Sequence, residues 1–150
     1  MRIHAIEQEL LVPEIRKFSR GLLDPEAMAR YGNLLAAVEA GEVEDELLGY
    51  LSIVLEISLQ SGRPRKLYGA DGEQALARLF QRTPAGAALS DAAKSVSEAL
   101  AGLQGQTLED IKVSTLGPGS YGLMIDTDRC QINVRLDRTG VRVENMAIGL

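Results

Sequence analysis

The sequence predicts an α+β fold with about five N-terminal helices packed on one face of a C-terminal, four-stranded antiparallel meander. Up to about residue 105 the apolar residues recur at helical spacing, whereas from about residue 111 they alternate with polar residues. The alternation is clearest at Cys130, Ile132, Val134 and Leu136, each of which is followed by a polar residue. This change of period separates a helical part from a sheet.

Local signals place the first helices. The first is expected over residues 3–20, and Pro13 should kink or split it because proline lacks a backbone donor. Asp24 and Pro25 open the second helix as a cap followed by a first-turn proline, and Gly41 ends it. The third spans about 42–61 and begins with acids, which the helix dipole favours. Its β-branched stretch 51–59 also allows a strand.

A turn-like segment over 61–72 is expected to follow. Asp71 then caps a short helix over 72–81, and Thr83 with Pro84 opens the last helix, which is rich in alanine.

The strand register can also be predicted. A connection over 126–129 places Ile125 opposite Cys130, and one over 137–140 places Val134 opposite Val143. A loop over 117–119 places Val113 opposite Leu123. All three registers put apolar residues on one face, so we interpret Cys130 as a small core residue rather than a reactive thiol.

Composition excludes several classes of function. The 150 residues fit one domain, 1–150, mainly helical over 1–105 and a sheet over 111–147. The net charge of −5 argues against nucleic-acid and membrane partners. The single cysteine and the single histidine, His4, argue against an internal disulfide, a metal site or nucleophilic catalysis. We therefore expect no cofactor and no metal in a soluble, cytoplasmic protein without a signal peptide.

Two groups of residues are candidate binding sites. The polar sheet face should carry Arg135 directly opposite Arg142, and like charges in that position are unfavourable. Glu144 on the diagonal, an anionic ligand or a partner's carboxylates would compensate them. The ligand-binding candidates on this face are Gln131, Asn133, Arg135 and Arg142. The second group is the basic segment with Arg63, Arg65 and Lys66, which is either an exposed connector or an anion site.

The sequence shows no catalytic constellation. Its two predicted edge strands, near 111–116 and 141–146, need cover or a partner. We therefore expect a non-enzymatic interaction or regulatory protein, adaptor- or chaperone-like, that binds another protein or itself as a homo-oligomer. The alternative is a small domain that binds an anionic ligand through Arg135 and Arg142 or through the segment 63–66. A third possibility is an enzyme that depends on paired carboxylates.

Overall fold

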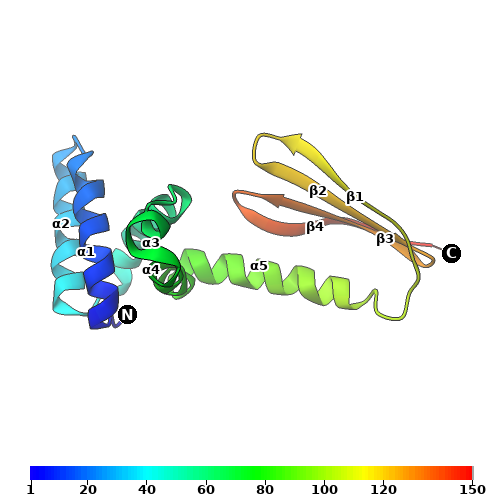
Figure 1. Ribbon diagram of the computed structural model, residues 1–150, viewed down its shortest axis with the longest axis horizontal. Coiled ribbons are helices and arrows are strands. Elements are labelled where there is room, and N and C mark those ends of the chain that lie inside the picture. Colours follow the sequence, from blue (N-terminus) through cyan, green and yellow to red (C-terminus); the bar gives the residue numbers. More distant parts are fainter. Residues whose placement is uncertain (150) are drawn as a thin grey trace. The chain divides into compact units, whose positions relative to one another are not determined.

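A computed structural model describes residues 1–149, in which five helices precede a four-stranded antiparallel meander (Figure 1). The predicted α+β class is confirmed. The chain divides into two compact units, Met1–Ala87 and a second that begins at Ala88. The single domain expected from the length stays a prediction. The elements are α1 (Ala5–Arg20), α2 (Pro25–Ala40), α3 (Asp45–Gln60), α4 (Arg63–Gln81), α5 (Pro84–Ala101), β1 (Leu108–Gly117), β2 (Ser120–Thr127), β3 (Cys130–Asp137) and β4 (Gly140–Ile148).

Helices α1–α4 of the first unit enclose a core of their own. Leucine, isoleucine and valine from each helix are fully buried there, among them Leu11, Leu34, Leu55 and Leu76. The predicted cap of α2 is confirmed, because the Asp24 carboxylate accepts the backbone amides of the next turn. Gly41 ends α2 with φ of 86°, in the left-handed region that favours glycine.

The structure decides three local expectations for this unit. Helix α1 continues through Pro13, so the proline does not split it, and 51–59 is helical within α3, as expected, which excludes the alternative of a strand. The segment expected to be a turn is also mostly helical: α4 begins at Arg63, and Gly69 interrupts it with φ of 74° and ψ of −174°. Pro64 fits this helix start because a first-turn amide has no acceptor inside the helix.

The sheet of the second unit has the order β1-β2-β3-β4. The predicted pairings of Val113 with Leu123 and of Val134 with Val143 are confirmed. The prediction for β2 and β3 is wrong by two residues, because Ile125 lies opposite Ile132 and not opposite Cys130. The connection contains two residues instead of four, since the Thr127 hydroxyl caps a tight turn. A shift of two residues keeps every side chain on its predicted face.

Helix α5 covers part of the apolar sheet face. Val96, Cys130, Ile132 and Val134 are buried in this second core, with apolar residues of α5, β2 and β4 packed around them. The same face continues on to β1, where Ile111 and Val113 are 54% and 71% exposed. The face is therefore covered over β3 and the first residues of β4, and it is open at β1 and at Met146 and Ile148 of β4.

Candidate functional site

The polar sheet face brings the predicted arginines together. Arg135 lies opposite Arg142, as predicted from the register. The carboxylate of Asp137 lies between them, 3.3 Å from Arg135 Nε and 3.2 Å from Arg142 Nη2. Glu144, the diagonal compensator, lies 3.2 Å from Arg135 Nη1. The chain thus supplies both compensating charges itself.

Asp137 is the member of this group that sequence reasoning missed, because it was assigned to a connection. Hydrogen bonds from the hydroxyl and the amide of Thr139, and then a hydrogen bond from Arg142 together with its charge, lower the pKa of Asp137 to about 2. Asp137 is therefore ionised near neutral pH and holds both guanidinium groups.

The predicted amides on this face have neighbours of their own. Asn133 Nδ2 donates to Asn145 Oδ1 at 2.6 Å, and Gln131 Nε2 lies 3.3 Å from the sulfur of Met124. These amide groups make their contacts within the sheet.

The basic segment is split among different contacts in the first unit. Arg63 Nε donates to the Glu14 carboxylate at 2.9 and 3.2 Å. Arg65 pairs with Glu73 at 3.3 Å, and Lys66 is exposed. The segment is therefore the first turn of a helix, and its three cations do not form one anion site.

Glu14 is a buried carboxylate that the sequence analysis did not single out. It is 4% exposed and accepts hydrogen bonds from the Ser58 hydroxyl at 2.7 Å and the Tyr68 hydroxyl at 2.9 Å, besides Arg63. Its hydrogen bond raises the pKa of Arg63, and burial followed by the same carboxylate raises the pKa of Tyr68. Its place between the apolar residues Leu11 and Ile15 of α1 was the available signal.

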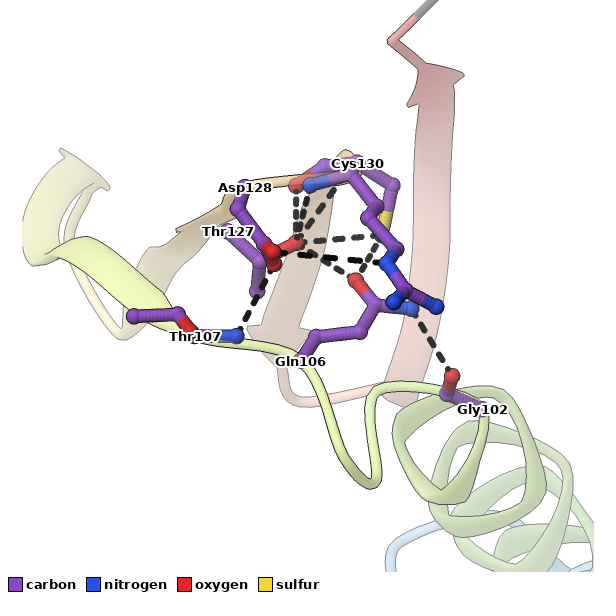
Figure 2. Close-up of polar contacts among 7 residues, drawn as sticks. Gly102, Gln106, Thr107, Thr127, Asp128 and Cys130 are labelled. Carbon is purple, nitrogen blue, oxygen red and sulfur yellow. Dashed lines mark hydrogen bonds and ion pairs between the residues drawn. The ribbon is translucent and has the colours of Figure 1, made fainter.

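A second polar cluster joins the segment after α5 to the turn between β2 and β3 (Figure 2). The Thr127 hydroxyl lies 2.6 Å from Gln106 Oε1 and accepts the Cys130 amide at 3.0 Å. The Cys130 thiol lies 3.4 Å from the same Gln106 oxygen, and Asp128 accepts the Thr107 amide at 2.9 Å. The cluster fixes the turn, and the thiol lies at the edge of the core, as expected for a small apolar residue.

An apolar groove follows the line between α5 and the edge strand β4. It consists of two adjoining depressions of about 420 and 300 Å³, which share Ala99 and Met146. The helix side presents small residues at spacings of three or four, so they lie on one face of α5 and its C-terminal turn. The lining side chains are mostly apolar: Ala92, Ser95, Val96, Ala99, Gly102 and Leu103 on the helix side, and Val141, Val143, Met146 and Ile148 on β4.

Among residues 1–149, no three His, Cys, Asp or Glu residues are grouped so that they could hold a metal ion. Nor does any helix there have the length and apolar character needed to cross a membrane. No known protein family, curated protein or solved structure matches this chain.

Proposed function

We propose that this chain is a non-enzymatic, adaptor- or chaperone-like protein that holds an extended apolar segment of a partner protein. The supporting observation is the apolar groove between α5 and β4 beside an open sheet edge. Extended peptides bind such edges through main-chain hydrogen bonds, while alternate side chains enter the flanking pockets. The groove offers both kinds of contact.

The side chains along the groove suit an apolar occupant. Met146 and Ile148 of β4 are 48% and 75% exposed, so a partner would remove apolar surface from water. Ala92 and Ala99 leave room above the helix for larger side chains. Glu144 is an extra residue in β4, so regular strand pairing with a partner is expected over 145–148.

The two alternatives have less support. An anionic ligand would compete with the carboxylates that already face Arg135, Arg142 and Arg63. A carboxylate-dependent enzyme needs two acids that face one enclosed pocket. The acids before and within the first turn of α3 instead line an open depression on the surface, and these are Glu42, Glu44, Asp45 and Glu46.

A peptide selection tests the proposal. The whole chain is panned against a library of short random peptides, and selected peptides are labelled for fluorescence anisotropy. Enrichment of peptides with alternating apolar residues is expected. Ala99→Phe should fill the groove and weaken their binding at least about tenfold.

Ala93→Phe is the matched control, because Ala93 is exposed on the same helix and does not line the groove. Circular dichroism checks that both variants keep their secondary structure. Equal binding by the two variants, or no enrichment of apolar peptides by the parent chain, would contradict the proposal.

A further inference from the structure

Strand β1 is an open edge of the sheet. It has ten residues, and its pairing with β2 is regular from Asp110 to Thr115. Four large apolar side chains on it are 48–71% exposed: Leu108, Ile111, Val113 and Leu116. Proteins usually protect such edges with proline, bulges, charge or a covering element. Here the irregularities lie at the two ends of the strand, and its sequence contains no proline.

The charges on β1 are arranged so that two copies of the strand complement each other. Asp110 and Lys112 flank Ile111, and their side chains lie 3.0 Å apart. In an antiparallel pair of β1 strands centred on Ile111, each Asp110 faces Lys112 of the other copy. Pairs centred on Asp110 or on Lys112 would place like charges opposite each other, which is unfavourable. A pair centred on Val113 would leave both charges without an opposite partner.

We propose that β1 pairs antiparallel with β1 of a second copy, centred on Ile111, so that the two sheets become one. The Ile111 amide donates to the Asp110 carboxylate at 2.9 Å, a local hydrogen bond that the partner strand would replace. Because the same short sequence supplies both complementary charges, a second copy fits this edge better than an unrelated strand. The dimer does not depend on the groove between α5 and β4.

Strand β4 also has opposite charges around an apolar residue, Arg142 and Glu144 around Val143, but it fits self-pairing less well. Glu144 is the extra residue at an irregularity in its pairing with β3. In addition, Arg142 and Glu144 already contact Asp137 and Arg135. Of the two edge strands, β1 has the more regular pairing, so we place the dimer contact at β1.

Light scattering on the whole chain tests the dimer. The parent protein should have twice the 16.2 kDa mass of one chain. Lys112→Asp and Asp110→Lys should each give monomers, because each places like charges opposite each other. Mixing the two variants should restore the dimer, since each strand then carries the charge that the other needs.

The mixed sample distinguishes the contact between two copies from the ion pair of Asp110 and Lys112 within one strand. Both variants lose that ion pair and mixing does not restore it, so a dimer in the mixture results from the contact between copies. Arg30→Glu, which breaks an exposed ion pair on α2, is the control and should stay dimeric. A monomeric parent protein, or a mixture that stays monomeric, would overturn the proposal.

Cross-linking tests the register. Ile111→Cys should form a disulfide between copies under mild oxidation, because the two cysteines would face each other. Val113→Cys should not, because Val113 would face Glu109. The parent chain provides the background, as its single cysteine, Cys130, is buried. Cross-linking at 113 but not at 111 would refute the register centred on Ile111.

Discussion

At the scale of single residues, Glu14 joins three helices of the first unit. Its carboxylate accepts hydrogen bonds from Ser58 of α3 and from Arg63 and Tyr68 of α4. A buried carboxylate costs free energy unless charged and polar groups satisfy it. Here a guanidinium group and two hydroxyl groups satisfy it, and we interpret the cluster as a structural contact that holds α1, α3 and α4 together.

Glu14→Gln should lower the free energy of unfolding by about 1–3 kcal/mol, because the variant keeps the size of the side chain and loses its charge-assisted hydrogen bonds. Urea denaturation measures this change. Glu9→Gln on the same helix is the control, because Glu9 is exposed, and it should change stability little. If both variants are equally stable, the hydrogen bonds of Glu14 do not stabilise the contact between the three helices.

At the scale of elements, Gly69 joins the two helical parts of α4, residues 63–68 and the part that follows it. Its φ of 74° and ψ of −174° lie in a region that other residues rarely adopt. Gly49, by contrast, lies inside α3, where a Cβ atom would meet nothing within 4 Å.

Replacing each of the two glycines by alanine should change the stability of the protein in opposite directions. Gly69→Ala should destabilise the protein by about 1–3 kcal/mol through backbone strain. Gly49→Ala should stabilise it by up to about 1 kcal/mol, because alanine loses less conformational freedom in a helix. Thermal unfolding followed by circular dichroism measures both, and a shift in the same direction would contradict this account.

Some features of the helices and strands could be predicted from the sequence and others could not. The turn chemistry of Asp24 with Pro25 and the alternation in the strands depend on near neighbours, so they predicted a helix start and the sheet faces correctly. The pairing of β2 with β3 was missed because the Thr127 hydroxyl selects a shorter turn. The helix that begins at Arg63 was missed because the whole segment 61–72 was interpreted as turn-like, whereas Pro64 lies in the first turn of a helix.

At the scale of the whole molecule, residues 1–149 form two hydrophobic cores, one within α1–α4 and one between α5 and the sheet. Leu55→Ala removes apolar volume from the first core and should lower its stability by about 2–5 kcal/mol. Hydrogen exchange should then show faster exchange in α1–α4 and unchanged protection in β2 and β3. Equal loss of protection in both units would mean that they unfold as one domain, as the length alone suggests.

The sequence by itself determined the kind and order of the elements, the apolar and polar faces of the strands and the two edge strands. These features follow from backbone geometry and short-range periodicity. Tertiary structure decided which charges meet. Asp137 lies between Arg135 and Arg142 because a turn returns β4 beside β3, and Glu14 meets Ser58 and Tyr68 from 44 and 54 residues away. It also decided how much of the apolar sheet face stays open, because α5 covers only part of a face that is mostly apolar.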